Sequence, residues 1–181
     1  MTIKAVTTWI VLTLAIAFGT CTIATLYAPT FIMNKAMSKL SQGQQSNSIA
    51  HSDPTTAEQR TIVRPSPDLA YSICIFDFSS AERVRIVMPK ADDYLSVALY
   101  DNNTDNFFHL NDAQIIADQA SIILYPPQVG IPSQASSNVD RYSLNAPTTR
   151  GLVLFRSVVR SSDDWQRINA DRKLMSCSAL Q

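Results

Sequence analysis

The sequence predicts a mainly β protein: an N-terminal transmembrane helix, then a small antiparallel β-sandwich or jelly-roll-like domain with one C-terminal helix. Three observations lead to this fold class. Residues 5–34 contain no charged side chain, and about 20 apolar residues are enough to span a bilayer. After Arg60, short runs of β-branched and aromatic residues alternate with turn signals, which is typical of an all-β domain. Near the C-terminus, a Ser followed three residues later by Asp precedes an amphipathic segment, which indicates a helix start.

The apolar run is interpreted as an uncleaved anchor over residues 5–28, preceded by a short tail over residues 1–4. Trp9 and Tyr27 stand 18 residues apart, about 27 Å along a helix, and both ring types favour the membrane interface. A cleaved signal peptide is disfavoured, since the nearest cleavage position, after Ala28, has the large Leu26 where a small residue is expected. A lipoprotein site at Cys21 is also disfavoured, because Phe18 and Thr20 stand at positions where aliphatic and small residues are expected.

The orientation of the anchor rests on weaker signals. Lys4 lies before the helix, and Lys35 and Lys39 lie after it, so the positive-inside rule is nearly balanced. Because a long C-terminal part can cross the membrane regardless of its charge, we expect the N-terminus inside and the body outside. A body that stays in the cytoplasm is the alternative.

Between the anchor and the β-rich part, two further segments are expected. Residues 29–40 have apolar side chains at helical spacing opposite Lys35 and Lys39, which predicts an amphipathic helical extension at the membrane surface; simple continuation of the transmembrane helix is the alternative. Residues 41–60 are polar and of low complexity, which predicts a flexible linker. The β-rich soluble domain is then expected over residues 61–181.

Five strands and one helix are expected in this domain. The strands are predicted at Tyr71–Phe78, Val84–Met88, Tyr94–Tyr100, Ser121–Tyr125 and Leu152–Val159. Residues 128–149 are rich in Pro, Ser and Asn and are expected to form a long loop. The helix is expected to begin at Ser161 and to run through Trp165 to Met175.

Charge and cysteine content exclude some functions. The whole chain carries 15 basic and 15 acidic residues, and from Arg60 onward the counts are 12 and 13, a net charge of −1. This balance argues against nucleic-acid binding. Cys74 and Cys177 are the only pair in the predicted soluble part; they could form one disulfide in an oxidising compartment or remain two separate buried thiols. No cysteine pair has metal-site spacing, and no cofactor is predicted.

The strongest candidate ligand-binding residues are Arg64, Asp68 and Tyr71, which open the first predicted strand. Two prolines between them hold the backbone extended. They could form a rigid lip that presents Arg64 and Asp68 to an anionic or polar ligand. Alternatively, an Arg–Asp pair could fix the entry to the strand while Tyr71 bonds a loop carbonyl.

Other polar clusters have weaker functional signals. Asp101, Asn103 and Asp105 echo a calcium loop, with Asp112 twelfth in the count. The turn glycine and the final Glu are missing, so a polar turn capped by its own side chains is the better explanation. His109 has no nucleophile-elbow serine to accompany it. Arg156 interrupts an apolar strand, and Asp77 is a possible partner for a buried ion pair.

Four segments together resemble a known bacterial envelope family, the domain of unknown function twelve fifty-four. They are Val63–Ser72 (VRPSPDLAYS), Tyr94–Asp101 (YLSVALYD), Leu154–Arg156 (LFR) and Asn169–Arg172 (NADR). The similarity covers most of the chain from Arg60 to Cys177, and its most specific part is the Arg-Pro-x-x-Asp-x-x-Tyr stretch.

The resemblance implies a location and a partner but no activity. It places the chain among short members with one membrane helix. Together with the expected orientation of the anchor, this predicts an inner-membrane protein with a periplasmic domain. Long members carry a second β-rich domain of unknown function, numbered twelve fourteen. A separate membrane-anchored protein with that second domain is therefore the implied partner. The sequence favours a non-catalytic module that docks this partner, and the alternative is a ligand-binding or half-enzyme domain whose site the partner completes.

Overall fold

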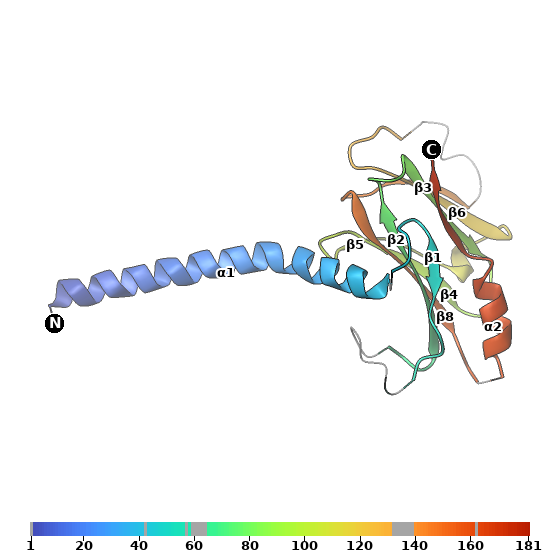
Figure 1. Cartoon of the computed structure of the whole chain (residues 1–181), viewed down its shortest axis with the longest axis horizontal. Helices are drawn as coiled ribbons and strands as arrows, with labels where there is room; N and C mark the ends of the chain where they lie inside the picture. Colours follow the sequence, from blue (N-terminus) through green and yellow to red (C-terminus); the bar gives the residue numbers. More distant parts are fainter. Residues whose placement is uncertain (1, 42, 57, 59–64, 132–139, 162) are drawn as a thin grey trace.

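The computed structural model of the chain consists of a long helix that projects from a β-sandwich (Figure 1). It describes all residues except 1, 42, 57, 59–64, 132–139 and 162. Within the described residues there are nine strands and two α-helices. The expected fold class, an N-terminal apolar helix followed by a mainly β domain with a C-terminal helix, is confirmed.

Helix α1 (Ile3–Leu40) is one continuous helix of 38 residues, with Pro29 inside it. Its threonine hydroxyls donate to carbonyls one turn earlier; for example, the bonds from Thr8 to Lys4 O and from Thr13 to Trp9 O are both 2.9 Å. A hydroxyl satisfied in this way can enter an apolar environment. By length and composition α1 could cross a membrane. The predicted anchor over 5–28 and the extension over 29–40 are therefore parts of one helix.

Two sheets form the sandwich, called the body below. The five-stranded sheet has the order β1 (Ile49–His51), β2 (Leu69–Asp77), β8 (Arg150–Val158), β4 (Leu95–Tyr100) and β5 (Asn106–Asn111), and every neighbouring pair in it is antiparallel. The four-stranded sheet has the order β7 (Arg141–Asn145), β6 (Gln119–Tyr125), β3 (Arg83–Pro89) and β9 (Ser176–Leu180). The pair β6–β7 is parallel, so the sandwich is mixed and not purely antiparallel.

The five predicted strands correspond to β2, β3, β4, β6 and β8, which are the interior strands of the two sheets. The four additional strands, β1, β5, β7 and β9, are the edge strands. An edge strand has one neighbour and faces solvent along its other side, so it carries more polar residues and a weaker apolar pattern. Strand β7 lies inside the segment that was predicted to be a long loop.

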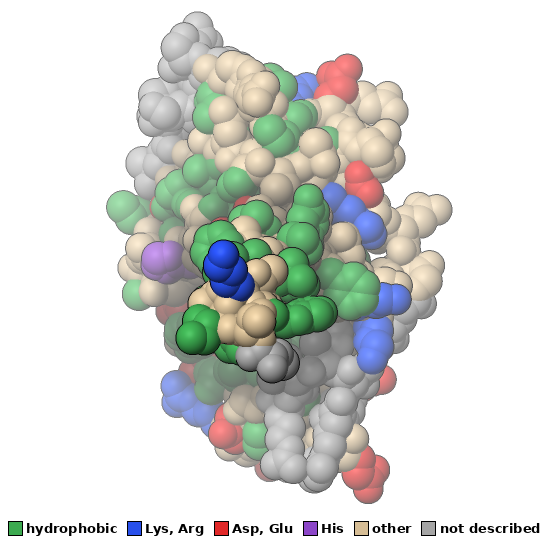
Figure 2. All heavy atoms as spheres, turned by 90° about the vertical axis from the view of Figure 1, so that its left-hand side faces the viewer, with side chains coloured by type: hydrophobic (Ala, Val, Ile, Leu, Met, Phe, Trp, Pro, Cys, Tyr) green, Lys and Arg blue, Asp and Glu red, His purple; other side chains and the backbone are tan. Residues whose placement is uncertain are grey.

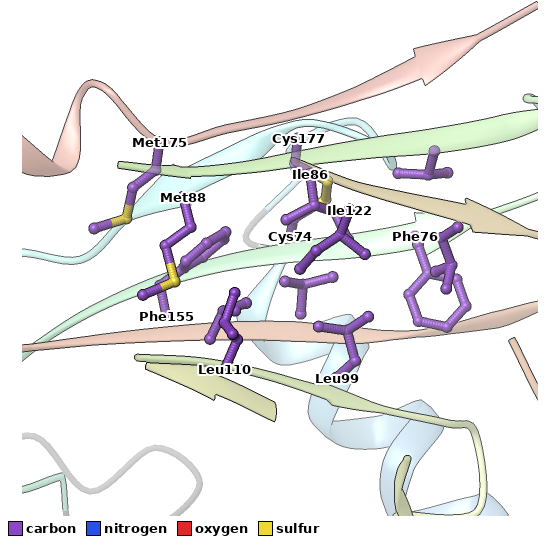
Figure 3. Packing of buried hydrophobic residues seen from close by; sticks show 14 of the residues in the cluster. Cys74, Phe76, Ile86, Met88, Leu99, Leu110, Ile122, Phe155, Met175 and Cys177 are labelled. Atoms are coloured by element: carbon purple, nitrogen blue, oxygen red, sulfur yellow. A yellow bond between two sulfur atoms is a disulfide. The ribbon is translucent and has the colours of Figure 1, made fainter. Parts of the chain in front are cut away.

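The core fills the space between the sheets (Figure 3), where side chains from both sheets point toward one another. Phe76 and Phe155 from the five-stranded sheet and Ile86 and Ile122 from the four-stranded sheet are completely buried there. A disulfide between Cys74 on β2 and Cys177 on β9 joins the two sheets across this core. The structure thus decides the alternative that the sequence left open.

Helix α2 (Trp165–Arg172) packs at one end of the sandwich through the buried Ile168 and Arg172. It begins later than predicted, although the Ser161 hydroxyl accepts a 3.4 Å hydrogen bond from the Asp164 N–H. It also ends before Met175, which is a core residue between α2 and β9.

The last turns of α1 pack on the outer face of the five-stranded sheet. Met33 and Met37 are buried there against Ile75 on β2 and Leu152 on β8. Ile73, Leu152 and Tyr100 alternate with core-facing residues on their strands. One face of these strands therefore packs in the core between the sheets, and the other face packs against α1. Figure 2, which looks along α1 from its N-terminus, shows hydrophobic side chains gathered around the helix in front of the body.

The structure differs from the prediction of a linker over residues 41–60. Within that range, residues 49–51 form β1, which pairs with β2 through Ile49↔Cys74 and His51↔Ser72. Ser52 is also bound, since its N–H and its hydroxyl donate to the Tyr71 carbonyl at 3.0 and 2.9 Å. Polar composition suggested a free segment, but a three-residue edge strand needs only backbone partners.

One predicted ion pair is wrong. Asp77 lies opposite Arg150 in the β2–β8 register, and their side chains approach to 3.6 Å. Arg156 lies opposite Tyr71, six residues farther along β8 and therefore about 20 Å away at the rise of a strand.

Candidate functional site

Tyr71 anchors the entry to β2. Its hydroxyl oxygen accepts a 2.9 Å hydrogen bond from the Ser66 N–H, which closes the turn that precedes the strand. The expected alternative was a bond to a loop carbonyl, whereas the observed partner is a backbone N–H. The Tyr71 side chain is thus engaged within the chain. Arg64, the first of the three candidates, lies outside the described residues.

Asp68 occupies a different environment from Tyr71. Its side chain is exposed, and it lines a surface pocket of about 440 Å³ beside Pro54, Pro67 and Trp165. Its carbonyl accepts a 2.8 Å hydrogen bond from the Val159 N–H, so the position of Asp68 is tied to the end of β8. Tyr71 is not among the described residues that line the pocket. The structure therefore does not bring the predicted trio together as one described site.

The pocket is apolar along its walls and polar at two places. Prolines, Leu69 and the Trp165 ring supply the walls, while Asp68 and Arg160 supply opposite charges. Ser161 also lines it, but neither His51 nor His109 does. A hydroxyl without a nearby base is a weak nucleophile. The described lining is suited to binding an amphipathic group, with one anionic and one cationic contact.

Arg172 packs against the ring of Trp165, the aromatic residue that lines the pocket. It is 1% exposed, and its guanidinium lies 4.8 Å from the centre of the Trp165 ring, a cation–π distance. It donates to the Ser52 carbonyl at 3.0 and 3.1 Å, to the Tyr71 carbonyl at 3.0 Å and to the Asn169 side chain at 2.8 Å. Burial lowers the pKa of Arg172. This residue thus joins α2 to β2 and to the residue that follows β1.

A second charged group lies beside the pocket, centred on Asp93. Its carboxylate accepts contacts of 2.8 Å from Arg160 and 2.6 Å from Arg167. The hydrogen bond to Asp93 raises the pKa of Arg167. Because Arg160 is already paired with Asp93, its charge is partly neutralised before any ligand arrives.

The residues that echo a calcium loop bind one another. Asp101 is buried, and its Oδ1 accepts backbone hydrogen bonds from Asn103 at 2.8 Å and Asp105 at 3.0 Å. Asn103 Oδ1 accepts a 2.6 Å bond from the Thr30 hydroxyl, and Asp112 Oδ1 accepts one of 3.1 Å from the Leu95 N–H. These contacts make a self-capped turn, called the 101–106 turn below. Among the described residues, no group of three or more His, Cys, Asp or Glu side chains is placed to hold a metal.

The two histidines have unrelated surroundings. His51 Nδ1 lies 2.8 Å from the Ser72 hydroxyl. Burial lowers the pKa of His51, and the nearby charges of Arg172 and Lys173 lower it further. His109 lies on the edge strand β5 and is exposed. The His51–Ser72 contact has the distance of a Ser–His pair, but the Ser72 side chain is buried, at 1% exposed, and neither residue lines the Asp68 pocket.

Trp165 and Arg160 line the pocket together with Asp68, although the sequence did not indicate them as its partners. Asp68 precedes β2, whereas Arg160 and Trp165 follow β8. Only the antiparallel pairing of β2 with β8, which places Leu69 opposite Val158, brings these three together. No local pattern in the sequence indicates that these three residues meet. Trp165, which follows two aspartates, was the one residue that could have been picked out as a candidate.

One solved structure has the same overall fold, and a second is similar over most of the chain at a lower score. The VPA0106 protein from Vibrio parahaemolyticus is similar with a TM-score of 0.62 and 11% sequence identity. The match covers 85% of the present chain and 35% of the VPA0106 chain. An uncharacterized protein from Burkholderia cenocepacia has a TM-score of 0.46 and 12% sequence identity. That match covers 82% of the present chain and 39% of the Burkholderia chain. At this identity the first likeness shows the fold alone. The present chain thus spans little more than a third of the solved proteins that it matches.

No curated protein matches the chain. A family model, in contrast, matches residues 46–179. This range begins just before β1 and ends within β9, so it takes in both sheets, the disulfide and α2. The earlier start also agrees with the assignment of β1 to the body. Since the matched range exceeds half of the chain, the protein belongs to the family described as "Protein of unknown function (DUF1254)".

Proposed function

We propose that this protein is a single-pass membrane protein of the bacterial envelope, with its N-terminus in the cytoplasm and its β-sandwich in the periplasm. The observation that carries the proposal is the exposed apolar surface of α1. The side chains of Trp9, Leu14 and Phe18 are each more than 60% exposed. A contiguous apolar surface of this length is unfavourable in water, and a lipid bilayer would cover it.

The disulfide supports the proposed side of the membrane. Cys74 and Cys177 are both buried and bonded across the core. Disulfides persist in oxidising compartments such as the periplasm and are rare in the cytosol. The flanking lysines favoured neither side, so the disulfide is an independent argument for a periplasmic body.

A topology reporter tests this orientation. An enzyme that is active only outside the cytoplasm, fused after Gln181, should be active in the full-length fusion, because α1 would leave the body on the periplasmic side. In a control fusion, replacement of Leu14 and Ile16 by Arg should abolish activity, since each Arg at a helix centre costs about 2.5–3.5 kcal/mol. Activity of a cytoplasm-only reporter at the same position would contradict the proposal.

Within this location, the body serves as a non-catalytic docking module for a separate membrane-anchored protein that carries a companion β-rich domain. Two observations support this role. The chain covers 35% of the VPA0106 structure, so the matched structure contains further chain beside the part that this fold matches. In addition, neither His51 nor His109 lines the Asp68 pocket, so the described lining contains no histidine that could act as a base for its hydroxyl groups.

The second candidate function is ligand binding at a site that the partner completes, and the Asp68 pocket favours it. Asp68, Pro67 and Trp165 all line this pocket. A docked protein could close such an open pocket over a small molecule. Asp68 would then contact the ligand directly, in agreement with the prediction made from the sequence.

Co-purification with the companion protein separates these functions. The full-length chain and the companion, expressed together, should elute as one complex. Asp68→Ala should change the free energy of unfolding by less than about 0.5 kcal/mol, since the side chain is exposed; Asp163→Ala, an exposed acidic neighbour of the pocket, is the matched control. Retained binding by both variants is expected for docking. Loss of binding by Asp68→Ala alone would favour the completed site, and separate elution of the wild-type proteins would contradict docking.

A further inference from the structure

Helix α1 is attached to the body by side-chain contacts along its last three turns. The first contact is the 2.6 Å hydrogen bond from the Thr30 hydroxyl to Asn103 in the 101–106 turn. Met33 and Met37 follow on the same side and are 5% and 0% exposed. These buried side chains lie against the five-stranded sheet, so rotation of the helix against the body would expose them to water.

The chain after α1 is also bound closely to the sheet. Asn47 donates from its N–H to Ile75 O at 2.8 Å and from its amide to Asp77 O at 2.8 Å, while its Oδ1 accepts a 2.9 Å bond from the Asp77 N–H. It is 7% exposed, with a φ of 59°, a conformation that Asn adopts more readily than most residues. Only residues 41–46 lie between the end of α1 and this clamp. The helix and the body are therefore joined as one piece.

This attachment starts very close to the membrane. If Trp9 and Tyr27 mark the two interfaces, Thr30 lies three residues beyond the hydrocarbon, about 4.5 Å along the helix. The headgroup region on one side of a bilayer is about 5–7.5 Å thick. The contact between Thr30 and Asn103 therefore lies within the headgroup layer. Any tilt of the helix would bring one side of the body still closer.

From this geometry we propose that the body rests directly on the phospholipid headgroups, with the 101–106 turn and the adjoining edge of the five-stranded sheet against the membrane surface. This inference rests on the proposed membrane anchor and adds a fixed orientation to it. The four-stranded sheet, on the other side of the core, faces away from the bilayer. Figure 1 shows the same arrangement, with α1 leaving from one broad side of the body and β3 and β9 on the other.

The side chains on the free side of α1 suit this position. Phe31 and Ile32 are 64% and 59% exposed at the level where the body begins. They would lie in the headgroup layer with their side chains tilted back toward the acyl chains, since helical side chains tilt toward the N-terminus of the helix. The Lys35 ammonium lies 5.9 Å from the centre of the Phe31 ring, one turn farther from the hydrocarbon. A lysine there can reach the lipid phosphates while its stem covers apolar surface.

Lipid quenching of two site-specific labels tests the orientation. Cys21→Ser removes the free native thiol, so that the remaining native cysteines, Cys74 and Cys177, are held in the disulfide. A fluorophore is then attached to a new cysteine, either Asp105→Cys in the 101–106 turn or Ser178→Cys on β9. Both positions are exposed. In vesicles that contain headgroup-spin-labelled phosphatidylcholine, quenching at position 105 should exceed quenching at position 178 several-fold. Equal quenching at the two positions would overturn the proposed seating.

Two controls keep the result interpretable. Met37→Asp places a charge in the contact between α1 and the sheet, so it should release the body and reduce the difference between the labels; Ser38→Asp places the same charge on the exposed side and should preserve it. Vesicle flotation is measured on every sample. Failure of the unmodified protein to float would refute the membrane anchor itself, whereas flotation with equal quenching would refute only the fixed orientation.

Discussion

Replacement of both Cys74 and Cys177 by Ala should lower the free energy of unfolding of the protein by about 2–5 kcal/mol. The two residues are 103 positions apart, so the bond closes a long loop in the unfolded chain, and a loop of about 100 residues corresponds to about 4.7 kcal/mol in the chain-entropy model. The bond also joins the interior strand β2 to the edge strand β9. Loss of the bond should therefore loosen β9 before the interior strands.

Denaturant unfolding of the detergent-solubilised protein measures this effect. Cys21→Ala is the matched control, because Cys21 is an exposed free thiol in α1, and it should unfold like the wild type. Wild-type protein treated with a reductant after unfolding should refold to the stability of the double variant. Equal stability of the double variant and the wild type would show that the disulfide does not constrain the chain.

Gly151→Ala should be the most damaging small substitution in the body. Gly151 lies on β8 between β2 and β4, opposite Phe76, and an added Cβ would overlap the Tyr100 carbonyl oxygen and the Phe76 ring. Tyr100 O is backbone, and Phe76 is completely buried and packs edge-to-face on Phe107. Neither neighbour can move without disturbing the sheet or the core. We expect a loss near or above the upper end of the roughly 1–3 kcal/mol typical of overpacking.

Thermal or denaturant unfolding of the two glycine variants checks this expectation. Gly130→Ala is the control, because a Cβ at that position would meet no atom within 4 Å, and its effect should stay within about 0.5 kcal/mol. If Gly151→Ala fails to fold, Gly151→Ser should fail as well, while Gly130→Ala remains folded. Equal stability of Gly151→Ala and Gly130→Ala would show that the close approach at β8 is not rigid.

The difference between interior and edge strands explains which elements could be predicted. Val84, Ile86 and Met88 on β3 are all completely buried, so their alternation is visible in the sequence. β9, in contrast, contributes only Cys177 to the buried core. Its pairing with β3 is a tertiary contact between residues about 90 positions apart. A strand that is held by backbone bonds to one neighbour leaves little trace in its own composition.

The candidate site was partly predictable for the same reason. Asp68 was selected because the prolines around it indicate a rigid, extended segment. Its neighbours Arg160 and Trp165 could not be selected, since they join it only through the pairing of β2 with β8. Tyr71 was selected with Asp68 by sequence proximity. Asp68 lies before β2, however, and the Tyr71 hydroxyl closes the turn at Ser66 instead of lining the pocket.

The sequence by itself determined the long apolar helix, the mainly β body and the five interior strands, because each of these depends on the pattern of residues that are close along the chain. The tertiary structure decided how these parts are joined. It bonded Cys74 to Cys177, placed β1 inside the segment predicted as a linker, and packed Met33 and Met37 of α1 against the sheet. These features depend on apolar faces and backbone groups that meet only after folding. An apolar side chain such as Met37 looks the same in a sequence whether lipid or a β-sheet buries it.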